Sequence, residues 1–240
     1  TACKGLFTAH GRGLSPLNPK HLKRVFILRK KGYCMVLTIF FVRHGHAENN
    51  RDGLFPNDLK NDYRLTEKGV EQARQAAEFL LDSKAEAIFS SPVYRAYQTA
   101  KIIGERLSLE VVKDERLREV ELGNLRNRPT KEIFENDPDW FMEYFNSETV
   151  YGLEKYQKIR ERMLDFVKDT FKKGYTKVIA VSHLEPIRAL LTLPLNVNGR
   201  EVRKIEIHNA SISTMRFEDP DLKEIRILSV DCVPLNRFFA

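Results

Sequence analysis

The chain has 240 residues, of which 42% are hydrophobic, with three cysteines and a formal net charge of +7. This length and composition predict one compact domain, and no apolar stretch approaches the roughly 20 residues that cross a bilayer, so we expect no membrane association. The odd number of cysteines and the lack of C-x-x-C spacing argue against a disulfide framework or a zinc site and favour a cytoplasmic location.

Residues 1–34 come first in chain order, and they hold the excess of positive charge. They contain eight lysines and arginines and no acid, so subtracting them from the net +7 leaves −1 for residues 35–240. The sequence thus divides into a basic extension over 1–34 and a domain over 35–240, and no nucleic-acid binding by the domain is expected. We interpret the extension as a disordered arm, as a targeting segment, or as non-native sequence that lies upstream of a start at Met35.

Apolar and polar segments alternate from Met35 onward. An apolar strand is predicted at 36–42, then a polar loop at 44–64 and a helix that Thr66 caps and that ends near residue 81. A short strand at 87–90, a helix at 92–107 and another short strand at 110–112 follow.

The second half continues the alternation. Short helical pieces rich in aromatic residues are predicted at 130–148, a long amphipathic helix at 153–171, a strand at 177–181 and a helix at 186–191. Two further strands are predicted at 211–217 and 224–230. This order is typical of an α/β fold in three layers, with a mostly parallel central sheet, helices on both faces and a small helical cap insertion.

Basic and imidazole side chains follow three of the predicted strands. Arg43 and His44 follow the first strand, Arg95 the second, and His183 the strand at 177–181. Ligands of open α/β sheets lie beyond the carboxyl ends of the strands, where the loops converge. We therefore expect these four side chains to meet at one site.

The segment Arg-His-Gly-His-Ala-Glu-Asn-Asn at 43–50 resembles the signature of the histidine phosphatase, or phosphoglycerate mutase-like, superfamily. Segments 65–73, 90–100, 117–119 and 181–183 resemble its further motifs in the family's order, and the resemblance covers residues 36–230. Several motifs in order are strong evidence, whereas one tripeptide would be weak. The resemblance is to the phosphatase branch and implies phosphoryl transfer without a metal or cofactor.

The resemblance also implies roles for the four converging side chains. His44 would attack phosphorus as a neutral imidazole and form a phosphohistidine, with neighbouring guanidiniums holding its pKa down. Arg43 and Arg95 would bind phosphoryl oxygens with paired hydrogen bonds. His183 would contact a non-bridging oxygen as an imidazolium.

Two more residues receive roles from motif position. Asn50 would add a neutral donor to the phosphoryl group. Glu119 would protonate the leaving group and later take a proton from water, with Glu121 as the alternative acid. At position 47, where the family usually has Ser or Thr, the chain has Ala47, so one hydroxyl contact is missing.

The pair His44 and His46 has the spacing of metal ligands on an extended segment. We expect no metal there, because Arg43 and Arg95 would repel a cation and no cysteine or carboxylate cluster accompanies the pair. His208 is expected to have a structural role.

These observations predict a phosphoric monoester hydrolase of the histidine acid phosphatase type, acting on a small phosphorylated metabolite. A cofactor-dependent phosphoglycerate mutase is the alternative, which Glu121 beside the acid and a compact segment at 124–151 disfavour. A non-catalytic binding module with a polybasic arm is the third hypothesis. The oligomeric state stays open. Seven basic and aromatic residues near the predicted cap either line the pocket or only pack within its helices: Arg126, Arg128, Trp140, Phe141, Tyr144, Phe145 and Tyr151.

Overall fold

The computed structural model describes residues 36–57 and 63–234, so the predicted extension at 1–34 lies outside the described residues. Six strands form one sheet in the order β3-β2-β4-β1-β5-β6. They are β1 (Leu37–Arg43), β2 (Ala87–Ser90), β3 (Val111–Lys113), β4 (Lys177–Ser182), β5 (Ile212–Phe217) and β6 (Ile225–Cys232). The first four run parallel, whereas β5 and β6 are antiparallel to their neighbours, so the prediction of a mostly parallel sheet is confirmed.

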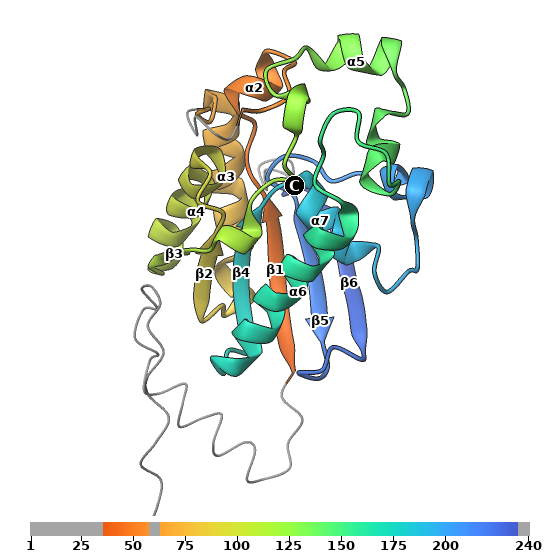
Figure 1. Cartoon of the computed structure of the whole chain (residues 1–240). Coiled ribbons are helices and arrows are strands. Elements are labelled where there is room, and N and C mark those ends of the chain that lie inside the picture. The colour runs from red at the N-terminus through yellow and green to blue at the C-terminus, as the bar shows by residue number, and fades with distance from the viewer. Residues whose placement is uncertain (1–35, 58–62, 235–240) are drawn as a thin grey trace, which may run out of the picture.

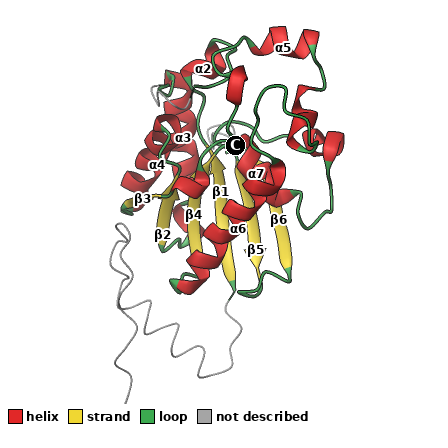
Figure 2. Cartoon of the chain, in the orientation of Figure 1, coloured by secondary structure: helices red, strands yellow, loops and turns green. Residues whose placement is uncertain are grey.

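Figure 2 shows helices on either side of this sheet and, at the top of the picture, beyond the ends of its strands. They are α2 (Glu48–Arg51), α3 (Glu67–Phe79), α4 (Tyr94–Leu107), α5 (Thr130–Asn136), α6 (Tyr156–Lys172) and α7 (Leu184–Leu191). The predicted cap of α3 is present, because the Thr66 hydroxyl accepts the backbone N–H of Gly69. The α/β class predicted from the alternating elements is therefore correct.

Three helix starts differ from the predictions. Helix α4 begins at Tyr94, two residues after the predicted start. Helix α7 begins at Leu184, two residues before the predicted start, because Pro186 is tolerated in a first turn where no N–H partner is needed. Helix α6 begins at Tyr156 rather than at 153. The carboxylate of Glu143 accepts four backbone N–H groups of residues 150–153 over 2.7–2.9 Å, which holds that segment as a loop.

Alternate residues of the strands pack into two separate apolar layers. Ile39 and Phe41 of β1 join Phe166 of α6 in the larger cluster, on the face where α6 crosses the sheet in Figure 1. Val42 belongs to the opposite cluster, where small side chains such as Ala77 let α3 and α4 pack closely. The sheet is therefore covered on both faces.

The aromatic segment folds into α5 and a 3₁₀ turn at Trp140–Tyr144, as short helical pieces were predicted. Helix α5 lies beyond the carboxyl ends of the parallel strands, at the top of Figure 1. No helix within the described ranges is both long and apolar enough to cross a membrane.

Candidate active site

The register of the two central strands brings two histidines together. Arg43 of β1 pairs with Ser182 of β4 in parallel register, so His44 and His183 leave the sheet at the same level. The backbone N–H of His44 extends the ladder by donating to the carbonyl of Ser182 over 3.0 Å. Both rings are buried, and they lie edge to face with centroids 5.1 Å apart.

Two glycines let the loop after β1 lie directly against the start of α3. A Cβ on Gly45 would stand 2.5 Å from the carbonyl oxygen of Gly69, and a Cβ on Gly69 would overlap the carbonyl oxygen of His46. The His46 ring contacts the Thr66 hydroxyl over 2.9 Å. His46 is thus engaged at the cap of α3, and no three metal-ligating side chains converge anywhere in the described part of the chain.

Arg95, in the first turn of α4, lies between the two imidazole rings. Its Nε–H donates to His44 Nε2 over 3.1 Å, and its Nη2 lies 3.1 Å from His183 Nδ1. A guanidinium can only donate, so both of these ring nitrogens accept. One side chain that is itself 1% exposed therefore sets the tautomer of both rings.

The remaining ring nitrogens agree with that assignment. His44 Nδ1 donates to the carbonyl oxygen of Gly45 over 2.8 Å, and His183 Nε2 donates to the Ser91 hydroxyl over 2.8 Å. Burial, with Arg95 and then other nearby cationic groups, lowers the pKa of both rings well below 6.5. His44 thus has an unprotonated Nε2 at neutral pH, and the imidazolium form expected for His183 requires a bound anion.

Arg43 supplies a second buried guanidinium. Its Nη1 donates to the carbonyl of Ile207 over 2.5 Å, whereas its buried Nε has no hydrogen-bond partner among the described residues. Burial lowers the pKa of Arg43 to about 10, an effect that Glu119 opposes and Arg188 reinforces. The group is still a cation at neutral pH, and a buried cation with an unpaired donor favours an anionic ligand.

Asn50 reaches the same cavity from the short helix α2. Its Oδ1 accepts the backbone N–H of Ala47 over 3.0 Å, so the amide nitrogen is left as the donor end of the side chain. Ala47 itself is fully buried in a small apolar cluster with Leu65 and Ala73. Ala47 therefore packs into that cluster and does not line the cavity.

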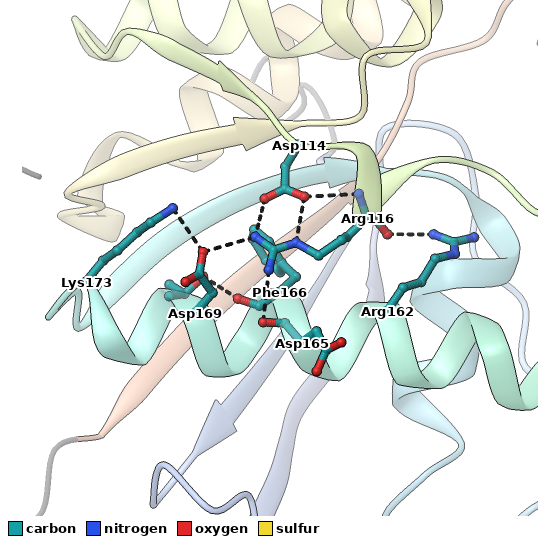
Figure 3. A network of polar contacts seen from close by, with 8 residues as sticks. Asp114, Arg116, Arg162, Asp165, Phe166, Asp169 and Lys173 are labelled. Carbon is teal, nitrogen blue, oxygen red and sulfur yellow. Dashed lines mark hydrogen bonds and ion pairs between the residues drawn. The ribbon is translucent and has the colours of Figure 1, made fainter. Parts of the chain in front are cut away.

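Glu119 lines the cavity on a segment that follows a 3₁₀ turn and has no regular structure. Arg162 of α6 donates to the carbonyl oxygen of Arg116 over 2.5 Å (Figure 3). It also donates to the carbonyl oxygen of Arg118 over 2.8 Å and lies 3.4 Å from that of Glu119. The guanidinium also pairs with Glu154 over 3.0 Å. Arg162 therefore holds in place the backbone segment that carries Glu119.

The end of β4 anchors the same segment, because the Ser182 hydroxyl donates to the carbonyl of Leu117 over 2.7 Å. The alternative acid, Glu121, is exposed and forms an ion pair with Arg126. Of the two candidates, Glu119 alone lines the cavity.

The cavity has a volume of about 190 Å³ and extends outward from the histidines. Beyond Arg43 it is lined by Arg203 and by Arg188, which is buried and pairs with Glu185 over 2.7 Å. Aromatic and apolar side chains form another part of the wall: Leu54, Phe55, Leu122, Phe134, Trp140 and Tyr144. We call this outer part, lined by these six residues with Glu185, Arg188 and Arg203, the outer chamber.

The structure gathers the predicted site residues at this one place. Five of them line the cavity: Arg43, His44, Asn50, Arg95 and Glu119. The sixth, His183, is fully buried and contacts Arg95. Of the aromatic segment, Trp140 and Tyr144 line the cavity, whereas Arg126 and Arg128 form ion pairs with Glu121 and Glu132.

Sequence reasoning missed three charged residues of the outer chamber. Glu185 and Arg188 stand three apart in an otherwise apolar helix, and a charged pair in such a helix is a readable signal. Arg203 gives no such signal, because it lies in a polar 3₁₀ turn. His208 lies outside the cavity lining and contacts Asp231 over 2.5 Å.

Known proteins are similar to this chain in sequence and in fold. A putative phosphoserine phosphatase 2 of Hydrogenobacter thermophilus is 30% identical over 183 residues, which are 75% of this chain and 89% of that protein. A 2,3-bisphosphoglycerate-dependent phosphoglycerate mutase of Thermoplasma acidophilum is 29% identical, over 81% of this chain and 92% of its own. The structure of a mycobacterial glucosyl-3-phosphoglycerate phosphatase aligns with a TM-score of 0.70 and 25% identity, covering 82% of this chain and 99% of that one.

The model of one protein family matches residues 39–228, from the first strand to the last. This match includes every residue that lines the cavity. The chain therefore belongs to the histidine phosphatase superfamily, branch 1.

Proposed function

We propose that this chain is a metal-independent phosphomonoester hydrolase that acts on a small phosphorylated metabolite through a phosphohistidine at His44. The observation that carries the proposal is a neutral His44 ring whose Nδ1 is tied to Gly45 and whose Nε2 faces the Arg95 guanidinium. A phosphomonoester bound by Arg95 and Arg43 would bring its phosphorus to that nitrogen. Two of the relatives described above are named as phosphatases, which supports the same function.

In the first step, Nε2 of His44 attacks phosphorus and the bond to the leaving oxygen breaks. Guanidiniums of Arg43 and Arg95 and the amide of Asn50 donate to the three phosphoryl oxygens, where charge is redistributed in the transition state. Glu119 in its acid form gives its proton to the departing oxygen, which leaves as an alcohol. The product of this step is a phosphohistidine with Glu119 ionised.

In the second step, water gives a proton to the Glu119 carboxylate and attacks the same phosphorus. The phosphorus–nitrogen bond breaks, its electron pair returns to Nε2 of His44, and inorganic phosphate leaves. The buried dianion favours a proton on His183, which the free site disfavours. Because the His44 pKa is low, the nucleophile stays unprotonated in mildly acidic solution, which supports activity of the acid phosphatase type.

A mutase would transfer the phosphoryl group to a second hydroxyl instead of to water, and the Thermoplasma relative bears that name. Two observations favour hydrolysis. Glu121 follows the acid and pairs with Arg126, so that arginine is already engaged by a carboxylate. The cap between the 3₁₀ turn Gly123–Leu125 and α6 consists of short turns and one helix of seven residues.

The test is a panel of phosphometabolites and p-nitrophenyl phosphate, with released phosphate as the readout. We expect the wild-type protein to release phosphate in the presence of a chelator, and His44→Ala to lose both turnover and the acid-labile phosphoenzyme. Isomerisation of 3-phosphoglycerate without phosphate release would instead identify a mutase. The proposal needs no partner other than the substrate, and we propose a cytoplasmic location.

A further inference from the structure

The outer chamber contains two buried hydrogen-bond donors that find no acceptor within residues 36–57 and 63–234. The Tyr144 hydroxyl and the Trp140 Nε1 are buried on the cavity wall and have no hydrogen-bond partner in the described part of the chain. Burial raises the pKa of Tyr144 well above 10, so this hydroxyl keeps its proton and can donate. Leaving such groups unpaired costs free energy, which a ligand with acceptor atoms would recover.

Arg203 adds a guanidinium to the same wall. It lies over the rings of Phe134, Trp140 and Phe141, with centroid distances of 5.2, 5.5 and 4.6 Å. Stacking on rings uses the faces of a guanidinium and leaves its N–H edge for in-plane hydrogen bonds to a planar anion. Tyr144 and Arg203 line the same cavity, and the Trp140 ring under Arg203 also packs against the Tyr144 ring, with centroids 5.8 Å apart.

The charges of the cavity also call for a second anionic group. Its lining carries four guanidiniums and two carboxylates: Arg43, Arg95, Arg188, Arg203, Glu119 and Glu185. Glu185 offsets Arg188, a phosphomonoester dianion offsets Arg43 and Arg95, and Glu119 is uncharged when it acts as the proton donor. Among the side chains that line the cavity, one positive charge is left, that of Arg203; His183, which does not line the cavity, adds a further positive charge once it takes up a proton beside the dianion.

We propose that the leaving group of the substrate carries a carboxylate, which Arg203 and Tyr144 bind in the outer chamber. A carboxylate offers acceptors both to the guanidinium edge and to the tyrosine hydroxyl, and its negative charge offsets that of Arg203. A second phosphate would place two negative charges beside Glu185, and a neutral leaving group would leave the charge of Arg203 without a counter-charge. This inference rests on the proposed hydrolase function and adds the substrate class.

The test uses two matched pairs of phosphomonoesters that differ in the carboxylate: O-phosphoserine with O-phosphoethanolamine, and 3-phosphoglycerate with glycerol 3-phosphate. We expect kcat/KM to be at least about tenfold higher for the carboxylate member of each pair. In Arg203→Gln and in Tyr144→Phe this preference should fall several-fold toward equality. Arg200→Gln is the matched control, because Arg200 is exposed in the same 3₁₀ turn, and it should keep the preference.

Each outcome decides a different claim. Equal kcat/KM within both pairs, with p-nitrophenyl phosphate hydrolysed, would overturn the inference and leave the hydrolase function standing. No phosphate from any ester would overturn the proposed function itself. A preference that survives in both variants would overturn the assignment to Arg203 and Tyr144. If Arg203→Gln does not fold, Arg203→Lys keeps the charge without the planar fork and should retain only part of the preference.

Discussion

Replacing Arg162 with methionine separates the positioning of Glu119 from the stability of the fold. The substitution keeps the apolar stem of the side chain but removes the donors to the carbonyls of Arg116 and Arg118. It also leaves Glu154 without its ion pair. We predict that it displaces the backbone of Glu119 and thereby impairs proton transfer to the leaving group.

The size of both effects follows from these contacts. A hydrogen bond from a charged donor contributes about 1.5–3 kcal/mol, and two short ones are lost here. The side chains of Arg162 and Glu154 are 18% and 15% exposed, so water replaces part of the loss. We expect the free energy of unfolding to fall by about 2–4 kcal/mol. A misplacement of the acid by about 1 Å can cost up to about 100-fold in rate.

The assay compares leaving groups. An alkyl phosphate needs a proton on its leaving oxygen, whereas p-nitrophenolate departs with little help. In Arg162→Met, kcat/KM for an alkyl phosphate should therefore fall by roughly 30- to 100-fold, and that for p-nitrophenyl phosphate by no more than about threefold. Glu119→Gln should show the same dependence on the leaving group.

Arg116→Gln is the matched control. Its guanidinium pairs with Asp114 and Asp169 over 2.5 and 3.1 Å, beside the same segment (Figure 3). Its side chain is not among those that bind the carbonyl of Arg118, so this variant should lose stability without selecting between leaving groups. Equal losses for aryl and alkyl substrates in Arg162→Met, or no loss for either, would refute the positioning role.

Three further predictions concern pH, packing and the N-terminal extension. Folding depresses the pKa values of His44 and His183, so below about pH 6.5 the unfolded chain binds protons that the folded protein excludes. As the pH falls, the free energy of unfolding therefore decreases by up to about 2.7 kcal/mol per pH unit for the two rings together. Urea unfolding at pH 7 and pH 5 measures this loss; His44→Gln should lose about half as much, and a constant midpoint would contradict the burial argument. Gly69→Ala would overlap the carbonyl of His46, so we expect a loss of more than about 1 kcal/mol in urea unfolding and a large loss of activity, whereas full activity would show that the loop yields. Deleting residues 1–34 should leave kcat/KM unchanged, and a fall in turnover without loss of folding would assign the extension a role in the site.

The centre of the site could be predicted from the sequence because strand ends and register decide it. Apolar runs end directly before Arg43 and His183, and parallel pairing of those two strands places the following residues side by side. Local signals also fixed the cap of α3, where one hydroxyl and one N–H suffice. Patterns within a short stretch of sequence were enough wherever a single helix or strand determined where a residue lies.

The position of Arg203 in the outer chamber and the start of α6 could not be predicted, because both depend on tertiary contacts. Arg203 reaches the cavity only because rings from α5 and from the 3₁₀ turn Trp140–Tyr144 support it. The late start of α6 likewise depends on Glu143, a single buried carboxylate that accepts four N–H groups from a loop. Neither arrangement has a period or a spacing that a sequence displays.

Arg95 links the binding of phosphate to the reactivity of His44. In the free site its Nε–H occupies the lone pair of His44 Nε2, the atom that must attack phosphorus, and its Nη2 occupies His183 Nδ1. Phosphoryl oxygens carry charge and are stronger acceptors than neutral imidazole nitrogens. An arriving phosphomonoester therefore draws both donors away from the rings, which frees the nucleophile and lets His183 gain a proton beside the dianion. A neutral ligand provides no such competition, so we expect His44 to become nucleophilic only when an anion takes its place as the partner of Arg95.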